Sequence, residues 1–406
     1  MFVSDDIATS DWRRDLDIFD ERYVLDPASI WAELRVDCPV AFSERRGRAH
    51  MPVNYADIAA VARDTDRFSS RRVGVVDLPR DHAEEDREPL QAPPITSDPP
   101  EHTWARRLLL PAFSPHQIDE MEPLTRELAR ELATMIRRQG RGDAARDYAQ
   151  HIPVRVIAHM IGVPATDEEL FTSWAVRILQ EGFNDLTSGL DAIIEVLKYF
   201  GQRVEERRAV AAANRPDDLL TLLIDSNHEG EPLTERHIVG SCFLLLIAGI
   251  DTTWSAIGSS LWHLATHPAD QRRLRDEPEL IDTAVEEFLR VYSPVTMARE
   301  VLEDTDVAGC PVKAGDKILM SFPAGNRDPS VFDRPDEFLI DRERNRHFAF
   351  GSGIHRCLGS NLARMELRVA IEEFLAAIPP FELADADAVT WTGGQVRGPR
   401  TVPISF

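Results

Sequence analysis

One stretch, from Thr234 to about His267, constrains the fold of this chain more than any other. It contains no proline, and its middle, Cys242 to Ile250, is apolar on every side of a helix. Thr234 is a suitable N-cap residue. A helix that is apolar all round needs protein on every side, so we expect it to run through the centre of a large fold. The apolar run is too short to cross a bilayer, which needs about 20 residues.

Polar residues follow this run abruptly, as Asp251, Thr252 and Thr253. In a structural interpretation, the two threonines bond back to carbonyls four residues earlier and merely bend a core helix. In a functional one, the bend opens a groove, because a carboxylate inside an apolar helix is costly unless it is paired or used. Ala248 and Thr252 share a helix face, and Gly249 thins the helix beside them.

A second feature is a glycine-rich turn that leads to a single cysteine. Gly351 and Gly353 allow positive φ and a close approach of the backbone to a flat ligand. Cys357 precedes a helix predicted over residues 360–378, whose N-terminus favours thiolate over thiol. Gly359 leaves room on the sulfur side. Such a thiolate suits a soft-ligand metal site, of which axial ligation of haem iron is one.

Other interpretations of this turn have less support in the sequence. A lone cysteine is usually a small buried hydrophobe, and a phosphate-binding turn would have glycine where Arg356 stands. A zinc site would need neighbouring ligands. The other cysteines, Cys38, Cys242 and Cys310, are scattered without framework spacing, which predicts a reduced, cytosolic protein.

The segment from Phe350 to Gly359 resembles the cysteine loop of the cytochrome P450 family, F-G-x-G-x-H-x-C-x-G, and matches every fixed position. Residues 248–253 resemble the A-G-x-D-T-T oxygen-groove motif of the same family. The resemblance implies a mainly α fold with small β-sheets (α+β), in which the long central helix lies over haem. It implies one domain over residues 1–406. Within it we expect β-rich parts at about 36–55, 295–325 and 385–406, and helical parts at about 100–290 and 358–378.

Glu287 and Arg290 resemble the family's E-x-x-R pair, which is structural and holds the segment before the cysteine loop. The family often adds a third partner, an arginine, and the position where it might stand is Glu337 here. Arg334 and Arg342 both remain open for this role.

Local patterns predict further elements. We expect a β-hairpin over 39–53, short strands over 307–319 and a last hairpin over 390–406 with Gly393 and Gly394 at its tip. Helices are expected over residues 55–64, 118–138, 152–161, 167–180, 190–212 and 216–224.

By the resemblance, the cofactor is haem b, with Cys357 as the axial iron ligand. The implied cofactor-binding residues are His102, Arg106, Ala248, Gly249, Arg299, Phe350, Gly351, His355, Cys357 and Gly359. His102, Arg106, Arg299 and His355 would meet the propionates. Asp251 and Thr252 would be catalytic, as the acid and the alcohol of a proton relay.

The implied substrate pocket is lined by Ile247, Ala248, Val295, Thr296, Met297 and Val396, and is covered by the loop from Val73 to Pro100. These side chains are mostly apolar and modest in size, so we expect a small to medium organic substrate. Arg71 and Arg72 near the loop could bind a substrate carboxylate, although surface exposure is the favoured interpretation.

The resemblance implies a monooxygenase that inserts one oxygen atom from O2. We find no flavin, NAD or iron–sulfur segment, so we expect a separate ferredoxin or flavodoxin with its reductase. A basic patch would steer this partner, formed by Arg106, Arg107, Arg344, Arg346, Arg356 and Arg364. The alternatives are a peroxide-driven peroxygenase, against which Asp251 and Thr252 weigh, and a haem sensor.

Composition bears on other classes of partner. With 46 basic and 69 acidic residues, the net charge is −23, which argues against nucleic acid, whose binding rests on basic patches. The first residues show no basic region followed by an apolar one, so we predict no signal peptide. We expect a cytoplasmic protein without membrane attachment.

Overall fold

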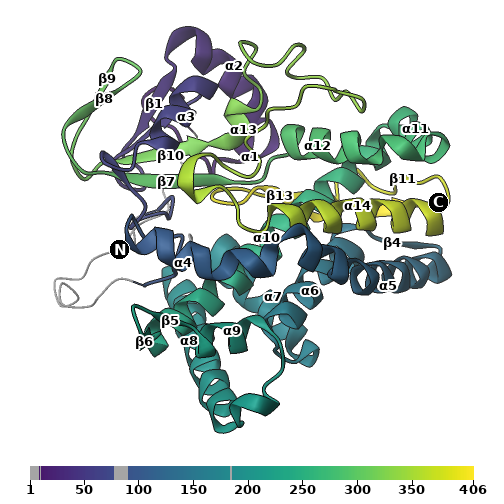
Figure 1. Ribbon diagram of the computed structural model, residues 1–406. Coiled ribbons are helices and arrows are strands. Elements are labelled where there is room, and N and C mark those ends of the chain that lie inside the picture. Colours follow the sequence, from purple (N-terminus) through teal and green to yellow (C-terminus); the bar gives the residue numbers. More distant parts are fainter. Residues whose placement is uncertain (1–8, 10, 77–89, 183–184) are drawn as a thin grey trace.

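The long helix α10 (Glu235–Thr266) runs through the middle of the molecule, as predicted (Figure 1). The structure, a computed structural model, describes residue 9 and residues 11–76, 90–182 and 185–406. The side chain of Thr234 caps α10 by accepting a hydrogen bond from the backbone of His237 at 3.2 Å. By length and composition α10 could cross a membrane, but 78% of its most apolar window is buried inside the protein. It is therefore the core helix of this fold.

The helical part of the molecule packs around α10, with α5 to α9 below it and α11 and α12 above it in Figure 1. Its helices are α4 (Glu101–Leu109), α5 (Pro115–Gln139), α6 (His151–Ile161), α7 (Glu168–Val176), α8 (Leu186–Ala209), α9 (Leu219–Asp225), α11 (Pro268–Asp276), α12 (Ile281–Val291) and α14 (Ser360–Ala377). Two predicted helices differ. The one over 167–180 changes at Arg177 into a π-helical turn, η4 (Arg177–Glu181). The one over 216–224 starts only at Leu219, because the side chain of Asp218 caps it.

A five-stranded sheet lies on the other side of the molecule, in the order β1-β2-β10-β7-β3. The strands are β1 (Val40–Ser43), β2 (Ala49–Pro52), β3 (Phe68–Ser69), β7 (Thr296–Val301) and β10 (Lys317–Ser321). The predicted hairpin is confirmed, since β1 pairs antiparallel with β2. The helices of this part are α1 (Glu21–Leu25), α2 (Pro27–Asp37), α3 (Tyr55–Arg63) and α13 (Phe322–Gly325).

Short strands complete the fold. They are β4 (Arg141–Asp143), β5 (Asn227–His228), β6 (Glu231–Pro232), β8 (Thr305–Val307), β9 (Cys310–Val312), β11 (Glu382–Leu383), β12 (Thr390–Thr392), β13 (Gly398–Thr401) and β14 (Pro403–Ser405). The expected last hairpin forms from β12 and β13. Its prediction was too simple, because β14 leaves the hairpin and pairs with β4 and β11.

A buried ion cluster fixes the segment that leads to the cysteine loop. Glu287 and Arg290 lie 2.8 Å apart with fully buried side chains. Arg342 is the third partner, since its Nε lies 3.0 Å from both carboxylate oxygens of Glu287. Arg334 is instead exposed and lies 3.4 Å from Glu337. The structure thus chooses between the two arginines that the sequence left open.

Candidate functional site

Two glycines shape the cysteine loop. Gly351 and Gly353 have φ values of 69° and 72°, the left-handed region that the sequence predicted for them. A Cβ added to Gly353 would lie 2.1 Å from the carbonyl oxygen of Ala62, so no other residue fits there. The backbone N–H of Cys357 donates to the carbonyl of Phe350 at 2.8 Å, which closes the loop just before Gly359, the N-cap residue of α14.

The thiol of Cys357 faces accessible space, although the residue lies deep among protein atoms. Burial raises the pKa of this thiol, while the backbone N–H of Gly359 and the charges of Arg106 and Arg356 lower it. The N–H group at the start of α14 thus favours the thiolate, as predicted, but the effect of burial on the pKa is larger. Binding to a metal ion would supply the missing stabilisation of the thiolate. In the described part of the chain, no three His, Cys, Asp or Glu side chains form a metal site of their own.

Four side chains predicted to bind carboxylates come together beside the loop. The rings of His102 and His355 have centroids 4.2 Å apart. Burial, with the charges of Arg299 and Arg106 and the nearby His102, lowers the pKa of His355 to about 2. Arg299 is 5% exposed, and burial lowers its pKa to about 10. With His102 and Arg299 buried and Arg106 and His355 half-buried, this group of donors fits a ligand with two carboxylates.

Hydrogen bonding in this cluster also fits an anionic ligand. Among the described residues, neither ring nitrogen of His102 has a well-aligned hydrogen-bond partner, and Arg299 donates to the carbonyl of Ala298 at 2.8 Å. Ser70, which sequence reasoning missed, forms a hydrogen bond between its Oγ and Nε2 of His355 at 2.8 Å. Asp98 in turn accepts from the Ser70 backbone at 2.8 Å. No motif marks either residue.

The middle of α10 carries an accessible strip. Ala248 is exposed, and Gly249 and Thr252 are half-buried, whereas Ile247 and Ile250 are buried. Oγ1 of Thr252 donates to the carbonyl of Ala248 at 2.8 Å, so the back-bond of the structural interpretation is present. This bond uses the hydroxyl proton and leaves the oxygen able to accept a proton or a hydrogen bond on the accessible side.

Asp251 is fully buried and has two partners that the sequence did not reveal. Its Oδ1 accepts a hydrogen bond from Nε2 of Gln180 at 2.9 Å and lies 2.9 Å from Nη2 of Arg400. Burial raises the pKa of Asp251, and Arg400 and Gln180 lower it. Both partners are distant in sequence, so no spacing rule could have found them.

Most of the predicted pocket residues meet where β7 begins. Val295 pairs with Val396 in an antiparallel bridge, and the backbone N–H of Thr296 donates to the carbonyl of Gln395 at 3.0 Å. The side chain of Gln395, which sequence reasoning missed, lies 3.5 Å from Sδ of Met297. The turn between β12 and β13 and the first residues of β7 thus lie side by side.

The structure describes part of the loop that was expected to cover the substrate pocket, and both arginines near it. Residues 77–89 of the expected covering loop lie outside the described residues. Arg71 has a side chain that is 73% exposed, in agreement with the favoured interpretation. Arg72 lies 2.9 Å from Glu300, which gives it an acidic partner within the protein.

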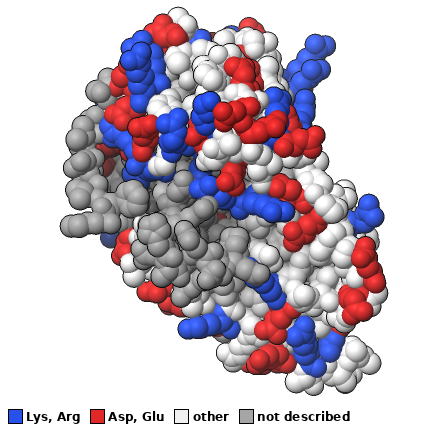
Figure 2. Space-filling model, turned by 90° about the vertical axis from the view of Figure 1, so that its left-hand side faces the viewer, with Lys and Arg blue, Asp and Glu red and all other residues white. Residues whose placement is uncertain are grey.

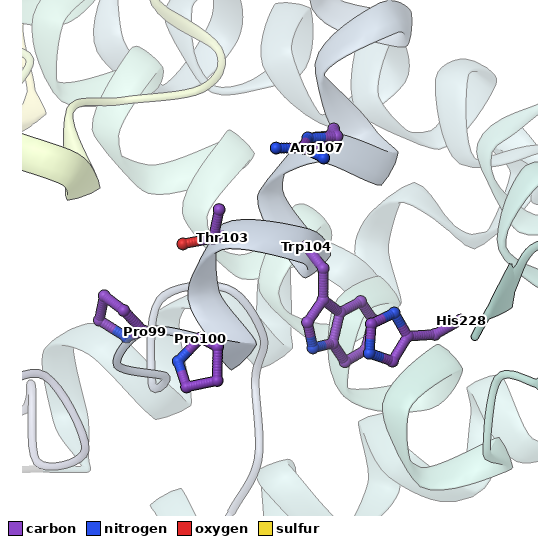
Figure 3. Close-up of a pocket in the computed structure, with 6 residues that line it drawn as sticks. All are labelled: Pro99, Pro100, Thr103, Trp104, Arg107 and His228. Carbon is purple, nitrogen blue, oxygen red and sulfur yellow. The ribbon is translucent and has the colours of Figure 1, made fainter.

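A surface depression lies on another face of α4, away from His102 and Arg106. It is lined by Pro99, Pro100, Thr103, Trp104, Arg107 and His228 (Figure 3). The ring of Trp104 stacks on that of His228 with centroids 4.2 Å apart. The depression is open and takes no residue from the cluster around Cys357.

Comparisons with known proteins show to which family the chain belongs. The family model described as Cytochrome P450 matches residues 172–378. The "Vitamin D(3) 25-hydroxylase" of Pseudonocardia autotrophica is 34% identical over 401 residues, 96% of each chain. The "Mycinamicin IV hydroxylase/epoxidase" of Micromonospora griseorubida is 32% identical and covers 88% of this chain and 89% of its own. The LnmA cytochrome P450 hydroxylase of the leinamycin pathway of Streptomyces atroolivaceus has a TM-score of 0.79 and 37% identity, over 93% of this chain and 96% of its own.

The fold and these relatives define a haem-binding oxygenase of the bacterial type. The chain belongs to the cytochrome P450 family, and it is therefore a haem-thiolate monooxygenase whose cofactor is haem b.

Proposed function

We propose that this cytochrome P450 inserts oxygen into a small to medium, largely apolar substrate, by hydroxylation or O-dealkylation. The observation that carries the proposal is that the apolar residues Val295, Met297 and Val396 come together at the start of β7. Thr296 and Gln395 supply the nearby polar groups. The names of the relatives cover vitamin D3 and mycinamicin IV, so they do not agree on one substrate.

The roles of the residues follow from their positions. Bound haem supplies the iron at which dioxygen is reduced. Cys357 binds that iron, and the cluster of His102, Arg106, Arg299 and His355 binds the propionates. Thr252 accepts a proton on the accessible side of α10, and Asp251 passes protons to this strip from the buried side.

Electrons come from a separate ferredoxin or flavodoxin with its reductase, and the protein acts in the cytoplasm. Arg107, Arg344, Arg346 and Arg356 are exposed and suit a docking surface. Arg364 is a weaker member of the expected basic patch, because it forms an ion pair with Glu286 at 2.5 Å. Figure 2 shows acidic and basic side chains interspersed over the visible face outside the grey region, so steering would depend on a local patch.

Cysteine ligation is tested by reducing the purified protein under carbon monoxide and recording the Soret band. We expect the strong red shift of thiolate-ligated ferrous haem, and we expect the Cys357→His variant to lose it. Cys242→Ala is the control, since that thiol is buried in α10 and should leave the band unchanged. A band typical of histidine ligation in the wild type would refute the role of Cys357.

The reaction type is tested by product formation from one substrate under two conditions. We expect product with O2 and a ferredoxin–reductase pair, and little with hydrogen peroxide alone. Product with peroxide only would identify a peroxygenase instead. Candidate apolar substrates are first selected by the spin-state shift that they cause in the ferric protein.

A further inference from the structure

The environment of Asp251 distinguishes its two carboxylate oxygens. Gln180 donates a hydrogen bond to Oδ1 at 2.9 Å. Nη2 of Arg400 lies 2.9 Å from the same oxygen as an ion pair without hydrogen-bond alignment. Oδ2 is buried and has no hydrogen-bond partner among the described residues. A buried carboxylate with every partner on one oxygen is unusual, because leaving a buried acceptor without a hydrogen bond is costly.

Arg400 is built into this position from several sides. It comes from β13, and its Cζ lies 4.4 Å from the ring centre of Trp254. Its Nη1 donates to Oγ of Ser255 at 3.2 Å. A Cβ added to Gly398 would lie 2.4 Å from Cβ of Ser255, so the strand presses directly on α10. The guanidinium therefore has little freedom to leave the carboxylate.

Gln180 reaches Asp251 from a different element. It lies in the π-helical turn η4, whose wider backbone turn is often found at functional sites. Its amide can donate to Oδ1 but carries no charge. Arg400 is therefore the ionic partner of Asp251 among the described residues, and Gln180 helps to orient the same oxygen.

We propose that Arg400 is a positioning residue for Asp251: together with Gln180 it holds Oδ1, and it leaves Oδ2 as the oxygen that takes up and releases the relayed proton. The inference rests on the proposed role of Asp251 in proton delivery. It adds the residue that determines which carboxylate oxygen of Asp251 transfers the proton, and over which pH range this transfer occurs.

The groups that face Asp251 give the sign of the pH effect. They are Gln180 from η4, Arg400 from β13, and Trp254 and Ser255, which hold Arg400, from α10. Burial favours the protonated acid, and Arg400 opposes it. Removal of Arg400 therefore raises the pKa of Asp251, so the acid stays protonated to higher pH.

The experiment compares Arg400→Met with Arg397→Met in the haem-loaded enzyme. Arg397 is a matched control, since it is also a largely buried arginine near β13 but donates to the carbonyl of Val24 at 2.7 Å. Two quantities are measured across pH. One is the infrared C=O band of a protonated aspartic acid, assigned by its loss in Asp251→Asn. The other is the ratio of product formed to reductant consumed.

The inference predicts that in Arg400→Met the protonated band persists to higher pH by about one unit or more, the shift expected when a close ion pair is lost. The pH midpoint of the product ratio should move in the same direction. Arg397→Met should change neither. Unchanged midpoints in a folded Arg400→Met variant would overturn the inference.

Two further variants keep the test decisive. If Arg400→Met does not fold, Arg400→Lys should give a smaller shift of the same sign, because lysine keeps the charge but lacks the fork of donors. Failure to shift in Arg400→Lys and in Gln180→Leu would then reject the inference. If Asp251→Asn leaves the product ratio and its pH profile unchanged, the proposed proton relay is wrong. If Asp251→Asn changes them but the Arg400 variants do not, the relay stands and only the role of Arg400 is rejected.

Discussion

Glu287 shows how much one residue can organise in this protein. Its buried carboxylate binds the side chains of Arg290, Arg342 and Asn345 and the backbone N–H of Leu339. These partners come from the helix itself and from the segment before the cysteine loop. A single side chain thus ties α12 to the backbone that carries Cys357.

At this scale we predict that Arg342→Lys destabilises the protein by about 3 kcal/mol, because lysine cannot replace both contacts to a buried carboxylate. Arg334→Lys should cost less than about 1 kcal/mol, since its pairs are exposed. The free energy of urea unfolding measures both variants. Equal losses would show that Arg342 is not the third partner.

Single residues also mark what the sequence could reveal. Cys357, His355 and Gly353 were predictable because they occupy fixed positions of one short sequence motif. The choice of Arg342 over Arg334 needed the fold, and so did the partners Gln180 and Arg400. These contacts join residues from separate elements, so no local pattern records them.

At the scale of elements, Glu286 of α12 joins two segments around the cysteine loop. It lies 3.0 Å from Nε2 of His347 and 2.5 Å from Nε of Arg364 on α14. Burial raises the pKa of Glu286, but hydrogen bonds from Arg364 and His347 outweigh it and bring the pKa to about 2.

This shift predicts a pH-dependent contribution to stability. The folded pKa lies below the unfolded value of 4.5, so the contribution is full above pH 4.5 and is lost as the pH falls towards 2. We expect Glu286→Gln to be less stable than wild type by about 1–3 kcal/mol at pH 7, with the difference shrinking over that window. Unfolding free energies at several pH values test this. Glu279→Gln, on an exposed residue, should show no such convergence.

Elements differ in how well the sequence predicts them. The long helices α5 and α8 were predictable because their apolar periodicity extends over many turns, and α10 because its long run without proline is apolar on every side. The strands β3 and β4 were missed, since two or three residues show no alternation. Their pairing depends on segments far along the chain, so the small sheets became visible only in the fold.

At the scale of the whole molecule, an acidic protein needs a local basic surface to attract an acidic electron donor. We predict that Arg344→Glu slows reduction by a [2Fe–2S] ferredoxin several-fold at low salt, with the difference fading at high salt. Stopped-flow reduction under carbon monoxide measures this rate. Arg138→Glu is the control, because Arg138 lies away from the cysteine loop. Its neighbour Arg137 donates to the carbonyl of Ala377, at the end of α14 that is remote from Cys357. Equal slowing in both variants would indicate net charge rather than docking.

The contact between β13 and α10 also has a consequence for biosynthesis. Arg400 and Ser255 are 145 positions apart. During synthesis α10 therefore emerges from the ribosome long before β13, the strand that packs against it. Until then, Asp251 lacks its ionic partner, and the nascent helix exposes apolar surface that chaperones bind. A transcript cut short before Arg400 would still encode the whole cysteine loop. Its product would nevertheless lack the strand that covers α10 and the ionic partner of Asp251, which makes it a substrate for proteolysis rather than a weaker enzyme.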